Sequence, residues 1–212
     1  MDKSSAIYRR MDKTIINAFI EISQELPFEK ITVQRITDAA LISRYTFYAH
    51  FKDKYEVAER IQNDLYQEFI DFIKTKIPEV DNQFVDSSRH WEEMDMLIGE
   101  FQQRHALKTQ SIINIHTETI DYSKCMKSFL IENYKSNFPQ HENADLEANI
   151  YANMAMAISD YYTDHGRSSK INKNVISSDI YAFLYAIGIH DPKLIEKEHA
   201  RFMRMEYESK RY

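Results

Sequence analysis

The 212-residue sequence contains little glycine, proline or cysteine, with three, four and one of these residues, respectively. Average proteins use glycine and proline at about 7% and 5% of positions, and strand-rich folds need glycine where turns require positive φ. The scarcity of both predicts an all-α protein in which long helices are joined by few connections. It also leaves no glycine-rich loop of the GxGxxG kind, which argues against the common nucleotide-binding enzymes.

Other absences narrow the class of protein further. The single cysteine, Cys125, permits no internal disulfide and no cysteine zinc cluster, as is typical of a reducing compartment. The first ten residues, MDKSSAIYRR, lack the apolar core of a signal peptide, and no apolar run approaches the roughly 18 residues of a membrane helix. We therefore expect a cytoplasmic protein without a membrane partner. No nucleophile–base or carboxylate spacing demands catalysis, so we predict no catalytic residue and no cofactor.

Charge is unevenly distributed along the chain. Residues 1–60 carry ten Lys or Arg against nine Asp or Glu, whereas the remaining 152 residues carry 17 against 24. Within the stretch 43–54, Arg44, Lys52 and Lys54 are opposed only by Asp53. A surface that binds a polyanion is therefore expected near the N-terminus.

Helix signals are dense in the first 77 residues. Apolar residues at helical spacing predict a first helix that Pro27 ends. Thr32 and Ser43 are placed to cap two short helices, and Asp53 with Glu56 forms a capping-box pattern at the start of a long helix. The predicted ranges of the last three helices are Val33–Ala40, Arg44–His50 and Asp53–Ile77.

The sequence pattern also predicts helices in the residues from 78 onward. A polar loop is expected over 78–90, followed by a helix with one face marked by apolar residues and His105. Glycines at 166 and 188 are placed to end two later helices, and an Asp-Pro pair opens the last one. The expected segments are Trp91–His105, the continuous or broken stretch Ile112–Tyr134, Leu146–His165, Asn174–Ile187 and a final helix from Asp191.

Two short helices joined by a three-residue turn describe a helix-turn-helix, the motif that places its second helix in the DNA major groove. Phe47 and Phe51 lie four residues apart and should anchor the second helix in the core. For any one of the remaining side chains, a merely solvated surface is the alternative to DNA contact. The side chains expected to point outward are Arg44, Tyr45, Thr46, Tyr48, Ala49 and His50.

Residues 31–54, ITVQRITDAALISRYTFYAHFKDK, resemble the TetR/AcrR family of transcriptional regulators. The resemblance is specific over roughly residues 10–60 and fades in the C-terminal two-thirds. Leu41 stands where the family usually has a turn glycine, so either the turn has a different backbone here or Leu41 accepts a strained conformation. Tyr45 stands where small residues are common, which changes the bases that can be read.

The resemblance implies a helix-turn-helix domain over residues 10–69 and a helical ligand-binding and dimerisation domain over residues 70–212. It implies a homodimer that binds double-stranded operator DNA at a palindrome and responds to an unknown small molecule. A repressor is favoured, with an activator as one alternative and an enzyme that uses the helical pocket as another. By position, the implied DNA-binding residues are Thr32, Gln34, Arg44, Tyr45, Thr46, Tyr48, His50 and Lys54.

The run IYAFLYAI at 180–187 is apolar all round and must be covered on both sides. A second subunit can supply one cover, so a dimeric four-helix bundle is predicted; the alternative is a central helix wrapped within one chain. The predicted interface residues are Leu146, Ile150, Met154, Ala157, Ile158, Tyr161, Ile180, Phe183, Leu184 and Ile187.

Aromatic residues, methionines and histidines recur on the helices predicted between the helix-turn-helix and the dimer interface. Cavities in helical bundles are usual small-molecule sites, so these residues are candidates for the effector pocket. The alternative is that a stripe of such residues at helical spacing simply belongs to the hydrophobic core. The candidates are Trp91, Met94, Phe101, His105, His116, Tyr122 and Met126. Neither His105 nor His116 belongs to a cluster with metal-ligand spacing, so no metal site is predicted.

Overall fold

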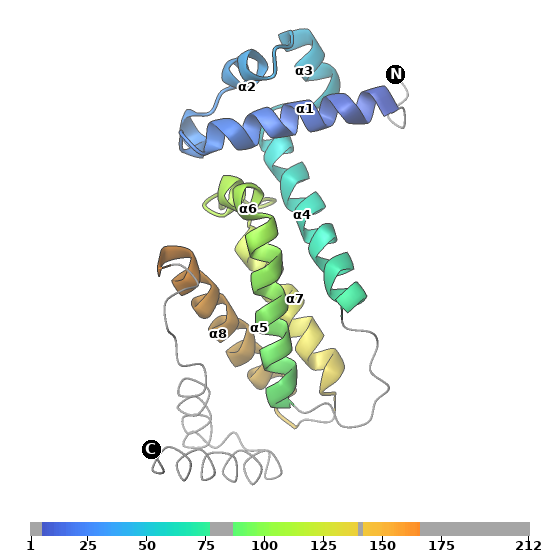
Figure 1. Cartoon of the computed structure of the whole chain (residues 1–212), viewed down its shortest axis with the longest axis vertical. Coiled ribbons are helices and arrows are strands. Elements are labelled where there is room, and N and C mark those ends of the chain that lie inside the picture. The colour runs from blue at the N-terminus through green and yellow to red at the C-terminus, as the bar shows by residue number, and fades with distance from the viewer. Residues whose placement is uncertain (1–5, 77–86, 140–141, 166–212) are drawn as a thin grey trace, which may run out of the picture. The chain divides into compact units, whose positions relative to one another are not determined.

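The computed structural model describes residues 6–76, 87–139 and 142–165, and within these ranges it is helical throughout (Figure 1). The chain divides into two compact units, residues 1–83 with 92–126 and residues 84–91 with 127–212. The predicted all-α class is confirmed. The predicted domain boundary at residues 69–70 falls inside a helix of the first unit, and the division into functional domains stays a prediction.

Five elements form the N-terminal part of the first unit. Their order is α1 (Ala6–Ser23), a 3₁₀ turn η1 (Phe28–Lys30), α2 (Val33–Ala39), α3 (Arg44–His50) and α4 (Lys54–Lys76). Figure 1 shows α2 and α3 on one side of α1 and α4 running away on the other. The first helix ends at Ser23, three residues before the predicted end at Leu26, and a turn closed by the bond from the Leu26 N–H to the Ile22 carbonyl follows.

Local side chains define the ends of the short helices. The Thr32 hydroxyl accepts from the Arg35 N–H at 3.3 Å, and the Ser43 hydroxyl accepts from the Thr46 N–H at 3.0 Å. At the start of α4, the Asp53 carboxylate accepts from the Glu56 N–H at 2.9 Å. Each bond satisfies a backbone donor that a helix start leaves without a partner. All three predicted caps are confirmed.

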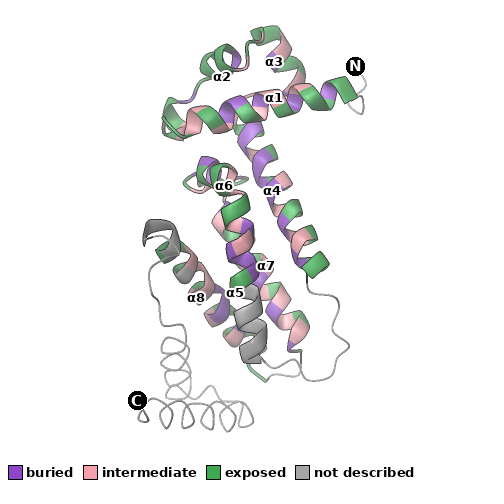
Figure 2. Cartoon of the chain, in the orientation of Figure 1, coloured by how far each residue is buried: buried purple, intermediate pink, exposed green. Residues whose placement is uncertain are grey.

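The core of the α1–α3 group is small and apolar. Ile15, Phe19, Ile36 and Phe47 are fully buried, and Phe51 is 4% exposed. The predicted anchoring of α3 by its two phenylalanines is therefore confirmed (Figure 2). A seven-residue helix is too short to be stable alone, so this burial is what holds α3 in place.

The remaining helices are α5 (Ser87–Arg104), α6 (Ala106–Ile112), α7 (Tyr122–Asn137) and α8 (Ala144–His165). The α6 helix packs against α1 and α4 within the first unit. In the second unit, the rings of Tyr134 on α7 and Tyr151 on α8 lie 5.4 Å apart, and the Tyr134 hydroxyl donates to Glu147 at 2.8 Å. Leu130 on α7, Phe138 directly after α7, and Ala148 and Ala152 on α8 are buried as well.

The structure also changes two later boundaries and decides one alternative that the sequence left open. The α5 helix begins at Ser87, inside the predicted loop 78–90. The predicted stretch Ile112–Tyr134 is broken: α6 ends where that stretch was to begin, and residues 113–121 connect α6 to α7. His105 caps α6 instead of lying within the preceding helix. The helices predicted over Asn174–Ile187 and from Asp191 lie outside the described residues.

Candidate nucleic-acid interface

The connection between α2 and α3 is a tight turn built around Leu41. The Leu41 N–H donates to the Asp38 carbonyl at 3.3 Å, and the Ile42 N–H donates to the Thr37 carbonyl at 3.0 Å. This pair of bonds is the Schellman arrangement, whose central residue takes the left-handed conformation that favours glycine. Leu41 adopts it with φ of 54°. Of the two alternatives for the missing glycine, the structure has the strained leucine.

The outer face of α3 carries three of the implied DNA-binding residues. Tyr45 is 86% exposed and Tyr48 is 51% exposed, and Arg44 is exposed beside them. The Arg44 guanidinium lies 6.0 Å from the Tyr48 ring centroid and donates to the Tyr48 hydroxyl at 3.4 Å. The face therefore presents one guanidinium and two phenol groups to any ligand that approaches it, as predicted.

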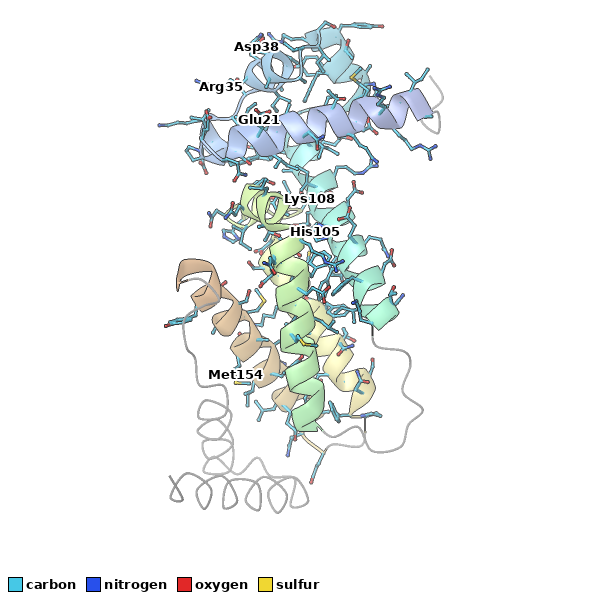
Figure 3. The ribbon with its side chains drawn as sticks, in the orientation of Figure 1. Glu21, Arg35, Asp38, His105, Lys108 and Met154 are labelled. Carbon is cyan, nitrogen blue, oxygen red and sulfur yellow. The ribbon has the colours of Figure 1, made fainter. Side chains whose placement is uncertain are left out.

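Thr46 is half-buried, and its hydroxyl lies 2.9 Å from the Ser43 hydroxyl. Two further candidates lie on or beside α2, which Arg35 and Asp38 mark in Figure 3. Thr32 is exposed at the start of α2, and the amide of Gln34 donates to Asp38 at 2.7 Å. The three side chains thus already have partners within the chain, although Thr32 and Gln34 remain accessible.

His50 points inward, contrary to the outward orientation predicted for it. Its Nδ1 lies 2.6 Å from the Asp12 carboxylate, and its side chain is 5% exposed. The ring stacks on Tyr8 with 3.9 Å between centroids. The Tyr8 hydroxyl in turn donates to the Ala49 carbonyl at 2.9 Å. We call Tyr8, Asp12 and His50 the α1–α3 latch, because these contacts fix the C-terminal end of α3 to α1.

Lys54 is also engaged within the chain. Its ammonium donates to the carbonyls of Phe28 at 2.7 Å and Glu29 at 3.3 Å, and it lies 4.4 Å from the Phe28 ring centroid. Partial burial lowers the pKa of Lys54, although the Glu29 carboxylate opposes this shift. Lys54 therefore joins the start of α4 to η1, which lies in the connection between α1 and α2.

Sequence analysis missed the latch because its partners lie far apart in the chain. Asp12 and His50 are separated by 38 positions. One signal was available: Tyr8, Asp12, Ile15 and Phe19 fall on a single helical face, and a carboxylate on an apolar face needs a buried partner.

The effector candidates fall into two small groups and several separate positions. Phe101 is 2% exposed, and its ring stacks on His105 with 4.2 Å between centroids and meets Phe69 edge-on at 5.1 Å. Tyr122 and Met126 are both buried on α7. His116 is exposed, with Nδ1 3.4 Å from Asp121. The side chains of Trp91 and Met94, on α5, lie outside the described residues.

Glu68 on α4 is the residue that sequence analysis missed in this region. Its carboxylate accepts from Lys108 at 2.8 and 2.9 Å and lies 3.3 Å from Nδ1 of His105 (Figure 3). Burial lowers the pKa of His105, with Glu68 opposing the shift. Burial raises the pKa of Tyr122, and the nearby Cys125 and Glu68 raise it further.

Neither metal binding nor membrane insertion has support in the described ranges. Among residues 6–76, 87–139 and 142–165, no three His, Cys, Asp or Glu side chains gather closely enough to hold a metal ion. No helix in the same ranges combines the length and apolar character that a membrane span requires.

No protein-family model matches the sequence, and no curated protein matches it. Solved structures, in contrast, match this chain in fold. A protein from Shewanella sp. PV-4, described as a tetR family transcription regulator, shares 16% identity with a TM-score of 0.61, and the match covers 83% of this chain and 97% of that one. The TetR family repressor AlkX from Dietzia sp. strain DQ12-45-1b shares 16% identity with a TM-score of 0.42 over 82% and 93% of the two chains. On the first of these comparisons, the chain has the fold of the TetR family of transcription regulators.

Proposed function

We propose that the protein is a DNA-binding transcription regulator, a repressor that leaves a palindromic operator when a small molecule binds. The observation that carries this proposal is the helix-turn-helix with its exposed arginine and tyrosines on α3. Helices of this kind enter the major groove, where arginine pairs with guanine edges and hydroxyl groups bind phosphates or bases. The fold shared with a protein described as a tetR family regulator supports the same function.

Roles for the exposed residues follow from their positions. Arg44, Tyr45 and Thr46 lie in the first turn of α3 and are proposed to read bases. Tyr48 is proposed to bind a phosphate, and Thr32 and Gln34 to add contacts from the start of α2. His50 and Lys54, which the resemblance implied to be DNA-binding residues, are proposed instead to position α3 and α4, because their polar atoms already have partners within the chain.

Dimerisation is proposed through α8. Leu146 and Tyr161 are 51% and 42% exposed, and Ile150, Met154 and Ala157 continue the same helical face. An apolar stripe of this length on a long helix is suited to a partner helix. The side chain of Ile158 and the predicted residues Ile180, Phe183, Leu184 and Ile187 lie outside the described residues. Two copies would place their α3 helices in successive major grooves, about 34–36 Å apart.

Effector binding is proposed to act on α3 through α4 and α6. The α6 helix contacts both α1 and α4, and Lys108 on α6 is bound to Glu68 on α4. A ligand beside Phe101, His105 and Tyr122 would therefore meet elements that touch the DNA-binding helices. Only a ligand that binds better to the state with misplaced α3 helices can release DNA.

Selection of bound sequences from random duplex DNA by the full chain tests this function. The expected result is an enriched palindrome, to which the protein binds as a dimer in mobility shifts. Arg44→Ala should relax the preference at one base pair of each half-site, and Tyr48→Phe should weaken binding to every duplex. Tyr55→Phe is the matched control, since Tyr55 is a similarly exposed tyrosine on α4. Failure to enrich any sequence would refute the proposal.

A further inference from the structure

The turn residue Leu41 combines two features that do not stabilise the fold. It is the one residue other than glycine with positive φ in the described part of the chain. It is also the most exposed of the large apolar side chains there, at 91%. A leucine in the left-handed conformation is strained by its Cβ, and glycine would take the same conformation without that cost.

Nothing in the turn compensates for this strain. A side chain that is 91% exposed buries almost no apolar area, so the folded state gains little from the hydrophobic effect at this position. The hydrogen bonds that close the turn come from the backbone of Leu41 and Ile42 and would form equally with glycine at position 41. A conformational outlier without a structural reason points to a function of the side chain.

The surroundings of Leu41 indicate what that function is. Figure 1 shows the α2–α3 connection on the side of α1 opposite α4. Arg44 and Tyr45 begin α3 within four positions of Leu41, and Tyr45 is 86% exposed. Leu41, Arg44 and Tyr45 are thus three exposed side chains within five consecutive positions, two of them large and apolar and one cationic. A neutral apolar partner would have no use for the guanidinium.

The DNA major groove offers one apolar group, the C5-methyl of thymine. A leucine beside a guanine-reading arginine can gain contact area there only from such methyl groups. We propose that Leu41, together with Tyr45, contacts thymine methyl groups next to the base pair read by Arg44, and so specifies T·A pairs in each half-site. This inference rests on the proposed function and adds a specificity-determining residue to it.

The test compares thymine with deoxyuridine, which lacks only the methyl group. Duplexes carrying the selected palindrome are prepared with each thymine of a half-site replaced in turn by deoxyuridine. Wild-type protein is expected to lose about fourfold in affinity for each methyl group it buries. Leu41→Gly should bind the thymine duplex about as weakly as wild type binds the deoxyuridine duplex. The affinity of Leu41→Gly should also stay unchanged when deoxyuridine replaces the thymine that Leu41 contacts.

Two further variants separate contact from folding. Leu41→Asn tolerates the left-handed conformation but is polar, so it should lose the same methyl preference as Leu41→Gly. Leu107→Asn removes an exposed leucine from α6, 59% exposed, and should leave both affinity and methyl preference unchanged. Leu41→Gly should raise the thermal midpoint, because it relieves the strain.

The outcomes distinguish this inference from the proposed function. If wild type binds a palindrome but Leu41→Gly binds it equally well, or keeps the same sensitivity to deoxyuridine, the methyl contact is overturned while DNA binding stands. If Leu41→Gly lowers the thermal midpoint, the strain argument is overturned. If wild type binds none of the duplexes, the proposed function itself fails.

Discussion

The N-terminal ends of α2 and α3 and the α4–α7 region use polar side chains in opposite ways. In the first, Thr32 and Ser43 satisfy helix ends, while Arg44 and Tyr45 are left facing outward. In the second, polar groups join one helix to another element. Gln62 on α4 is 4% exposed, donates to the Thr119 carbonyl at 3.1 Å and accepts from the Asp121 N–H at 2.7 Å. Under the proposed function, the outward-facing side chains of the first region meet a partner, whereas the polar side chains of the second hold its own elements together.

The first prediction concerns the core that makes the outward-facing region rigid. Phe47→Ala should cost about 3–5 kcal/mol in the free energy of unfolding, because it empties the fully buried site that anchors α3. Chemical denaturation followed by circular dichroism measures this loss. Tyr45→Ala changes an 86% exposed aromatic residue on the same helix and should cost far less. Equal losses would show that α3 is not held by its phenylalanine.

The second prediction concerns the α1–α3 latch. Asp12→Ala should destabilise the protein by about 1–3 kcal/mol, because it leaves Nδ1 of the buried His50 without its partner. Binding to all DNA should weaken with no change in sequence preference, since α3 is loosened and its outer face is unaltered. Mobility shifts on matched and mismatched duplexes measure both effects.

Asp64→Ala is the control for the latch, because it breaks an ion pair with Arg60 in which both side chains are about half exposed. Exposed pairs of this kind contribute at most about 1 kcal/mol. A change in base preference for Asp12→Ala would contradict a purely positioning role.

The third prediction concerns the inward-facing polar groups. Gln62→Leu should cost about 1–2 kcal/mol, because the Thr119 carbonyl and the Asp121 N–H both lose a buried partner. DNA affinity without effector should remain near that of wild type. Thermal denaturation and mobility shifts measure the two quantities, with Gln67→Leu, at an exposed position of the same helix, as the control. A larger loss in DNA affinity than in stability would place Gln62 in the DNA-binding machinery.

The smallest expected effect is that of Lys54. A lysine that neutralises a phosphate steepens the salt dependence of DNA binding by about one ion. Because the Lys54 ammonium is bound to the Phe28 carbonyl, Lys54→Met should leave the slope of log affinity against log salt unchanged. A slope reduced by about one would show that Lys54 leaves η1 to bind a phosphate after all.

The sequence was informative where structure is decided locally. Thr32 predicted the start of α2 at Val33, and Ser43 with the spacing of Phe47 and Phe51 predicted α3 at its observed bounds, Arg44–His50. These signals act within four positions of one another, so a single sequence contains them in full.

Prediction was undecided or wrong where a distant residue decides the structure. The apolar periodicity from Ile112 onward left open whether the stretch is broken, and the break over 113–121 is held by Gln62, 57 positions before Thr119. In the same way, the inward orientation of His50 depends on Asp12. Contacts across such separations are tertiary, and they override the local pattern of the segments that they join.

The shortness of α3 limits the number of base pairs that one copy of the helix can contact. Seven residues at 1.5 Å each give a rod of about 10 Å, the height of roughly three stacked base pairs. A sequence of three base pairs recurs by chance every few dozen base pairs in any genome, so one helix of this length cannot specify a unique site. Under the proposed function, two copies of α3 read two half-sites, which doubles the number of base pairs recognised, and every further base pair read by a neighbouring side chain lowers the number of chance matches.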